Sequence, residues 1–239
     1  MHLKKITFQP EEYPTREYYP FNLKIFNETR SIVFTTPVTF FIGENGTGKS
    51  SLLKAIANKC NIHIWKSYES PGYIRNEYCD DLYKHIDVEW FKDYVPGSYF
   101  SSEIFSDFAH ILDEWAKTDS AMLKYFGGES LVTKSHGQCH MAYFSGRYRI
   151  KGLYLLDEPE NALSPKSQLQ LLKLLKEMSK AGHAQFIIAS HSPILLALTG
   201  TTIYSFDHIP VKQVKYEETD YYQIYKDFLN NKDKYLADL

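Results

Sequence analysis

Short apolar runs separated by turn residues dominate the first 42 residues of the chain. Residues 3–8, 21–26 and 31–34 are rich in β-branched and aromatic side chains, and Pro, Asn and Glu lie between them. Several of these runs alternate apolar and polar positions, which is typical of antiparallel strands with one face in water. We therefore predict an N-terminal antiparallel sheet.

The second half of the chain shows a different pattern, in which apolar runs alternate with helix-like segments. Residues 151–156 and 185–190 contain the continuous apolar runs 153–156 and 186–189, of the kind found in strands that are buried on both faces. Between them, Ser164 and Pro165 form a helix start, and Gly182 forms a helix stop. The order predicts an α/β fold with a mostly parallel core sheet flanked by helices.

The apolar runs fade between residues 62 and 130, where aromatic residues lie among acids and lysines. Residues 102–126 keep a helical spacing of apolar side chains. We predict a mostly helical insertion packed by aromatic rings, and a ligand-binding aromatic surface is the alternative. The chain is then one domain, 1–239, with a core of residues 1–61 and 131–200, the insertion 62–130 and a tail 201–239, helical from residue 221.

Composition narrows the classes of function. The 239 residues carry a formal net charge of −2, so no overall basic field points to nucleic acid. Three widely spaced cysteines form neither a disulfide framework nor a zinc motif. The N-terminus lacks a secretory signal pattern, and no run of 18 apolar residues is present. We expect a cytoplasmic protein without a transmembrane segment of its own.

Residues 43–50 read Gly-Glu-Asn-Gly-Thr-Gly-Lys-Ser, between the apolar run 38–42 and the helix-like run 51–57. This is the G-x-x-x-x-G-K-[ST] spacing of a phosphate-binding loop. Glycines let the backbone turn its N–H groups toward phosphate oxygens, and the following helix adds its positive end. Lys49 is placed to reach the β- and γ-phosphates, and the Ser50 hydroxyl is placed to bind Mg²⁺.

Acidic and imidazole side chains follow the two buried runs. Asp157 and Glu158 end the first run, and His191 ends the second. Ligands of open α/β sheets lie beyond the carboxyl ends of the strands, next to the phosphate loop. Asp157 is therefore a predicted Mg²⁺ ligand, and Glu158 is predicted to orient or deprotonate the attacking water. His191 could donate to the γ-phosphate, but a histidine at a strand end, taken by itself, is more often structural.

A Gly-containing polar turn, Ser135-His136-Gly137-Gln138, precedes another helix-like segment. Taken together with Asp157-Glu158-Pro159-Glu160, Asn161-Ala162-Leu163-Ser164 and Ser190-His191-Ser192-Pro193, it resembles the ABC-type ATPase heads in order and separation. Within that superfamily the chain looks less like transporter subunits than like stand-alone bacterial AAA family ATPases related to the SMC, RecF and OLD heads. Its C-terminal tail is similar to that small family as well.

The resemblance implies a fold, an activity and a set of site residues. Asp157 would be the Walker B acid, Glu158 the catalytic base, Asn161 to Ser164 the D-loop, and His191 the switch histidine. Ser135 and Gly137 would contact the γ-phosphate of an ATP held by a second protomer, so that two ATPs are buried in a head-to-tail homodimer. ATP and Mg²⁺ would be bound by the phosphate loop, namely by Gly43, Glu44, Asn45, Gly46, Thr47, Gly48, Lys49, Ser50 and Ser51.

The chain departs from the family pattern in two places. His136 replaces the usual Gly, and no Gln occurs from residue 51 to residue 137, so the usual Q-loop glutamine is absent. Residues 73–77 are the candidate for that loop, with Glu77 or Asn76 as the metal or water partner. Four aromatic residues near the N-terminus are candidates for stacking on a nucleotide base or for ordinary packing, namely Tyr13, Tyr18, Tyr19 and Phe21.

The sequence thus predicts an ATP-hydrolysing ABC-type ATPase that works as an ATP-sandwiched homodimer and acts on an unknown protein or DNA partner. A DNA-linked or defence role rests on analogy of fold. Two alternatives stay open: the ATP-binding subunit of a membrane transporter, and an ATP-dependent binding switch with little turnover.

Overall fold

The computed structural model describes residues 1–65, 76–119, 123 and 135–236, and contains two sheets. The smaller sheet is antiparallel and has the strand order β2-β1-β4. Its strands are β1 (Leu3–Phe8), β2 (Ser31–Val33) and β4 (Ile86–Trp90). The predicted N-terminal antiparallel sheet is present, and its third strand comes from far along the chain.

The larger sheet has the order β5-β6-β7-β3-β8-β9 and is parallel except for β9, which pairs antiparallel with β8. The predicted mostly parallel core sheet is therefore confirmed. Its strands are β3 (Val38–Ile42), β5 (Gly97–Ser101), β6 (Gly152–Asp157), β7 (Ala184–Ala189), β8 (Thr202–Ser205) and β9 (Lys212–Val214).

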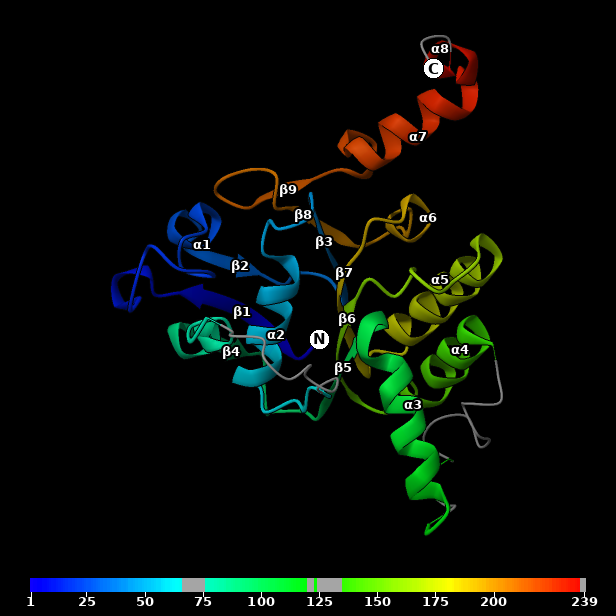
Figure 1. The fold of residues 1–239 in the computed structure, drawn as a ribbon, viewed down its shortest axis with the longest axis horizontal. Helices are drawn as coiled ribbons and strands as arrows, with labels where there is room; N and C mark the ends of the chain where they lie inside the picture. Colours follow the sequence, from blue (N-terminus) through cyan, green and yellow to red (C-terminus); the bar gives the residue numbers. More distant parts are fainter. Residues whose placement is uncertain (66–75, 120–122, 124–134, 237–239) are drawn as a thin grey trace.

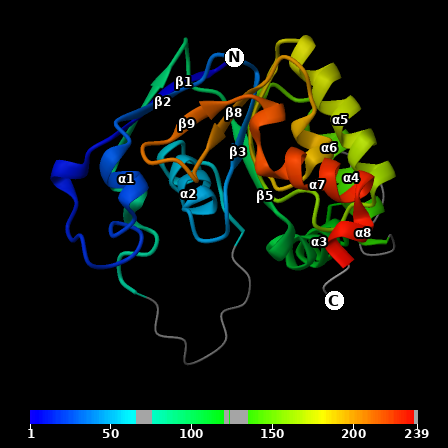
Figure 2. The ribbon, with the colours of Figure 1, turned by 90° about the horizontal axis from the view of Figure 1, so that it is seen from above.

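Helices lie on both faces of the larger sheet (Figures 1 and 2). Helix α2 fills the space between the two sheets, and α3 to α6 cover the opposite face. The helices of the described residues are α1 (Lys24–Glu28), α2 (Lys49–Lys59), α3 (Ser102–Ala116), α4 (His136–Arg147), α5 (Pro165–Lys180), α6 (Pro193–Leu196), α7 (Asp220–Asn230) and α8 (Lys232–Leu236).

Successive side chains along the central strands point to opposite faces and belong to two separate hydrophobic clusters. Phe41 and Ile187 point toward α2 and the small sheet, whereas the neighbouring Phe40 and Ile188 point toward the helices on the other face. All four side chains have no exposed surface. The continuous apolar runs in the sequence reflect this burial on both faces.

Two expectations about local structure are wrong. Residues 21–26 do not form a strand, because the segment ends in helix α1, whose turn is held by Asn27 Nδ2 donating to the carbonyls of Phe21 and Leu23. The described part of residues 62–130 is not mostly helical, because it holds β4 and β5 as well as α3. Both strands pair with distant segments, β1 and β6, so neither is visible from local spacing.

The buried side chain of Gln185 on β7 joins the N-terminal strand to the core. Its Oε1 accepts hydrogen bonds from the backbone N–H groups of His2 and Leu3 at 2.6 and 2.8 Å, and its Nε2 donates to the carbonyl of Leu3 at 2.9 Å. Gln185 therefore satisfies backbone groups at the start of β1 that would otherwise be buried without partners.

We predict that Gln185→Leu lowers the free energy of unfolding by about 2–4 kcal/mol, because it leaves buried backbone groups unpaired. Urea unfolding measures the loss. Gln213→Leu on the exposed face of β9 is the matched control and should change stability by less than about 0.5 kcal/mol. Equal effects of the two substitutions would contradict the bridging role.

Helix α4 packs through His140 onto an aromatic cluster. The ring of His140 lies 5.0 Å from that of Phe100 and 4.6 Å from that of Phe105, centroid to centroid, and the residue is only 2% exposed. Burial lowers the pKa of His140 to about 4. The folded protein therefore keeps this imidazole neutral, whereas the unfolded chain protonates it below its ordinary pKa of about 6.5.

Acidification below pH 6.5 should accordingly lower the free energy of unfolding. This decrease should continue to about pH 4, where the folded state also binds the proton. Between pH 7 and pH 5 we expect His140→Leu to lose about 2 kcal/mol less unfolding free energy than the wild type. Urea unfolding at the two pH values measures this, with His110→Leu on the exposed face of α3 as control. Parallel losses in wild type and His140→Leu would refute it.

Candidate functional site

The phosphate-loop sequence lies between β3 and α2. Gly43, Gly46 and Gly48 have φ values of 142°, 82° and 101°, a region that residues with a Cβ rarely adopt. At Gly48, which precedes the first residue of α2, a Cβ would lie 2.7 Å from the ring of Phe26. Both the backbone turn and the packing of α1 against the loop therefore require glycine at this position.

The Lys49 side chain is buried beneath the loop, with 4% of the residue exposed. Its Nζ donates to the carbonyls of Gly43 at 2.6 Å and Glu44 at 2.9 Å. Burial lowers the pKa of Lys49, and the charges of Glu158 and Asp207 partly oppose this. Asp207, which follows β8, also accepts a hydrogen bond from the Glu44 N–H at 2.8 Å and so fixes the start of the loop.

Ser50 and Asp157 meet although they are 107 positions apart. The Ser50 hydroxyl donates to Asp157 Oδ1 at 2.9 Å, and the Tyr99 hydroxyl donates to Oδ2 at 2.9 Å. Burial raises the pKa of Asp157, and these two hydrogen bonds counteract it. Hydroxyl and carboxylate oxygens are the donor set that Mg²⁺ takes from proteins, so Ser50 and Asp157 fit such an ion. Tyr99, on β5, was not identified from the sequence.

Glu158 has a left-handed backbone, with φ 49°, which is rare for a residue with a long side chain and typical of functional sites. Its Oε1 lies 3.3 Å from His191 Nε2, and its Oε2 accepts a hydrogen bond from Asn161 Nδ2 at 2.7 Å. Burial, and next the charge of Lys49, lower the pKa of His191, the neighbouring carboxylate of Glu158 partly opposes this, and the net shift favours the neutral imidazole.

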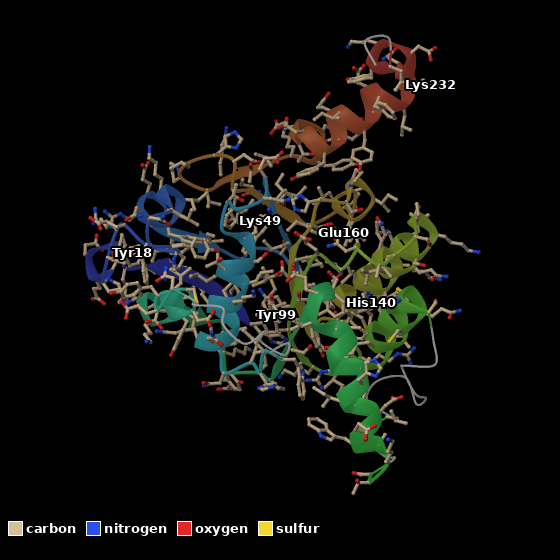
Figure 3. All side chains as sticks on the ribbon, viewed as in Figure 1. Tyr18, Lys49, Tyr99, His140, Glu160 and Lys232 are labelled. Atoms are coloured by element: carbon tan, nitrogen blue, oxygen red, sulfur yellow. The ribbon has the colours of Figure 1, made fainter. Side chains whose placement is uncertain are left out.

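Glu160 fixes the chain that carries His191. One carboxylate oxygen, Oε1, accepts from Ser190 Oγ at 2.8 Å, His191 N at 2.5 Å and Ser192 N at 3.1 Å. Burial raises the pKa of Glu160, and the hydrogen bonds oppose that rise. Figure 3 labels Glu160 and, on helix α2, Lys49. The sequence motif contains Glu160 but predicts no role for it.

Ser135 and Gly137 lie at the start of α4, away from the phosphate loop. Ser135 is exposed, and its N–H and hydroxyl both donate to Gln138 Oε1, which stabilises the first turn of the helix. A Cβ on Gly137 would lie 2.9 Å from the carbonyl of Ala162, so this turn packs against the segment 161–164. No hydrogen bond joins Ser135 or Gly137 to residues 43–51 within the described part of the chain.

Glu77 is not placed as a metal ligand. It is exposed, and its carboxylate interacts with the hydroxyl of Tyr78, not with Ser50 or Asp157. Residues 73–75 of the candidate Q-loop lie outside the described residues. Asn76 Nδ2 donates to the carbonyl of Tyr19 at 2.6 Å, and the Tyr19 hydroxyl contacts Ser51 Oγ, so Asn76 reaches the phosphate-loop helix through Tyr19.

The four N-terminal aromatic residues divide into two pairs. Phe21 is fully buried, and the Tyr13 ring packs against it at 4.7 Å between centroids. Tyr18 and Tyr19 are 55% and 40% exposed. Packing therefore accounts for the first pair, and only the second pair is accessible to a nucleotide base.

Two family models match parts of the chain: "AAA domain" over residues 21–58, and "AAA domain, putative AbiEii toxin, Type IV TA system" over residues 139–197. None of the proteins with curated descriptions matches the sequence. Among solved structures, CbiO1 of Clostridium perfringens, described as part of the ABC transporter complex CbiONQ, has a TM-score of 0.52 and 19% identity over 89% of this chain and 92% of its own.

The SMC head domain of Thermotoga maritima has a TM-score of 0.46 and 16% identity over 90% of this chain and 99% of its own. The chain thus has the fold of a P-loop ATPase head of the ABC type, with AAA-domain matches on both halves of the core. None of the described helices combines the length and the apolar composition that crossing a membrane requires.

We predict that Glu160→Ala lowers the free energy of unfolding by about 2–4 kcal/mol, because buried donors at residues 190–192 lose a shared carboxylate acceptor. Chemical denaturation measures this. Glu177→Ala on α5 is the control. The Glu177 carboxylate is about half exposed and lies 4.0 Å from Lys173, so its ion pair is weak and its loss should cost less than about 0.5 kcal/mol. A change as small for Glu160→Ala would show that the carboxylate does not stabilise this turn.

Proposed function

We propose that this chain binds Mg-ATP at the phosphate loop and hydrolyses it to ADP and phosphate, with Glu158 as the general base. The observation that carries the proposal is the arrangement of Lys49, the Ser50–Asp157 pair and Glu158 at one edge of the larger sheet. A cation, a metal-binding oxygen pair and a carboxylate are the groups that phosphoryl transfer to water requires.

Each side chain has a task that its contacts suit. Lys49 neutralises charge on the β- and γ-phosphates, and its burial strengthens that interaction. Ser50 and Asp157 hold Mg²⁺, which when bound offsets the charge that develops on the phosphate oxygens. Glu158 accepts a proton from the attacking water, while Asn161 and His191 keep its carboxylate in place.

The head-to-tail homodimer belongs to the same proposal. Ser135 and Gly137 form no hydrogen bond with the phosphate loop among the described residues, and the exposed N-terminus of α4 is available to ATP held by another protomer. Donors supplied by a second subunit stabilise charge only after assembly. A monomer would then hydrolyse ATP slowly, because half of each site is missing.

Two classes of partner are compatible with the proposed ATPase cycle. The match of residues 139–197 to a family described by a "putative AbiEii toxin" of a toxin–antitoxin system favours a defence-related role, and a DNA-linked role rests on analogy of fold. The likeness to CbiO1 favours a transporter subunit. DNA retention that falls steeply with salt would support the first class, and copurification with membranes would support the second. A single protein partner without ATP turnover would instead indicate a binding switch.

The proposal predicts that ATP turns monomer into dimer when hydrolysis is blocked. Glu158→Gln should bind Mg-ATP, hydrolyse it about 100-fold or more slowly than wild type, and double in mass by light scattering. Adding Ser135→Arg should keep it monomeric, because a bulky cation then occupies the position meant for the γ-phosphate contact.

The controls separate binding from assembly. Lys49→Ala should lose ATP binding, whereas Lys59→Ala at the other end of α2 should keep it. Ser31→Arg on the exposed face of β2 should dimerise normally. ATP binding to Glu158→Gln without a change in mass would refute the homodimer, and full hydrolysis by Glu158→Gln would refute the role of Glu158.

A further inference from the structure

The C-terminal tail reaches into the nucleotide site through one side chain. Helix α7 begins at Asp220, and the Tyr221 hydroxyl lies 2.9 Å from the carbonyl of Gly43 and 2.7 Å from His191 Nδ1. It therefore touches the first residue of the phosphate loop and the histidine beside Glu158 at the same time. Neither contact is suggested by local sequence, because Tyr221 and Gly43 are 178 positions apart.

Contacts at the start of helix α7 fix the position of the Tyr221 hydroxyl. Thr219 is 3% exposed and caps α7, because its Oγ1 accepts a hydrogen bond from the Tyr222 N–H at 3.2 Å. The Tyr216 hydroxyl donates to the carbonyl of Pro193 at 2.9 Å, and its ring packs on that of Tyr222. These contacts fix the first turn of α7 to helix α6, which follows His191 and Ser192.

The direction of the hydrogen bonds determines where His191 carries its proton. A carbonyl oxygen only accepts, so both contacts are hydrogen bonds only if the single hydroxyl proton of Tyr221 points to Gly43, whose oxygen also accepts from Lys49. The Tyr221 oxygen is then left to accept, and His191 Nδ1 must donate to it. A neutral imidazole has one N–H, which is thereby placed on Nδ1.

The opposite side of the ring faces Glu158. His191 Nε2 is buried and has no hydrogen-bond partner within the described residues, although it lies 3.3 Å from Glu158 Oε1. A lone pair on Nε2 would repel the carboxylate, so this contact becomes a hydrogen bond when Nε2 takes up a proton. Nε2 is thus kept free to take a proton next to the carboxylate that we assign as the base.

We propose that Tyr221 is a positioning residue, which fixes the Nδ1-protonated form and the orientation of His191 and so connects the C-terminal helix to the hydrolytic site. The effect on turnover rests on the proposed ATPase function, whereas the effect on the imidazole does not. Displacement of the first turn of α7 would release His191 from this form, so the tail is part of the site and not an appendage.

The first test reads the imidazole directly. In nucleotide-free protein labelled with ¹⁵N-histidine, two-bond ¹H–¹⁵N correlations at pH 8 should show His191 protonated on Nδ1, with the signal assigned by its loss in His191→Gln. Tyr221→Phe should shift the signal toward the Nε2-protonated form. Tyr222→Phe on the same turn is the control and should leave it unchanged, since the Tyr222 hydroxyl contacts Lys226. An unchanged His191 signal in Tyr221→Phe overturns the proposal, whether or not the chain hydrolyses ATP.

The second test asks whether Tyr221 acts through His191. Tyr221→Phe should lower kcat about 10-fold or more with little change in KM, as the loss of an orienting hydrogen bond does elsewhere. In a His191→Ala background the same substitution should have no further effect on kcat. An equal loss in both backgrounds overturns the proposal. If Tyr221→Phe folds poorly, 3-fluorotyrosine at 221, which keeps the hydroxyl, should retain both wild-type turnover and the Nδ1-protonated signal, and its failure to do so would also count against the proposal.

Discussion

Parallel pairing in register across the larger sheet is the constraint on which the site depends. Phe41 on β3 and Asp157 on β6 are both paired with Ala189 on β7, so the three strands end at the same level. Side chains alternate between the faces of a strand, and a slip of one residue would turn Asp157 away from Ser50. The chemistry at the sheet edge is therefore set by apolar pairing beneath it, and the fully buried Phe40 and Leu156 belong to that pairing.

Burial of charge is the second feature that the fold must accommodate. Lys49 and Asp157 are 4% and 7% exposed and Glu160 is partly buried, and burial shifts the pKa of each in the direction that favours its neutral form. Hydrogen bonds offset much of the free-energy cost of removing these charges from water. The partners are loop carbonyls for Lys49, hydroxyls for Asp157, and backbone N–H groups for Glu160. The arrangement keeps these groups oriented before any ligand arrives, which is the condition for strong electrostatic stabilisation.

Sequence patterns predicted the features whose causes are local. The phosphate loop, the acids after β6 and the histidine after β7 follow from short motifs beside apolar runs, and the structure places them at one sheet edge. Strands β4 and β5 were missed because they are short and are defined by distant partners. Tyr99 could not be assigned for the same reason, since its hydroxyl matters only through Asp157, 58 positions away. Asp207 could have been considered as a site residue, because it is an acid shortly after β8, the strand that pairs with β3, and so lies at the same sheet edge as the phosphate loop.

Tyr221 illustrates a limit of another kind. The chain contains 19 tyrosines, and the spacing around Tyr221 suggests only a helical tail. Its significance lies in a single proton that must serve one of two neighbours, the carbonyl of Gly43 or the imidazole of His191. Since the carbonyl has no proton to give, both contacts are hydrogen bonds only if the imidazole donates, and on our proposal the tail thereby sets the protonated nitrogen of a side chain next to Glu158. A residue acquires this role only from the folded geometry, which brings Gly43 of the phosphate loop and His191 after β7 to the hydroxyl group of one tail residue.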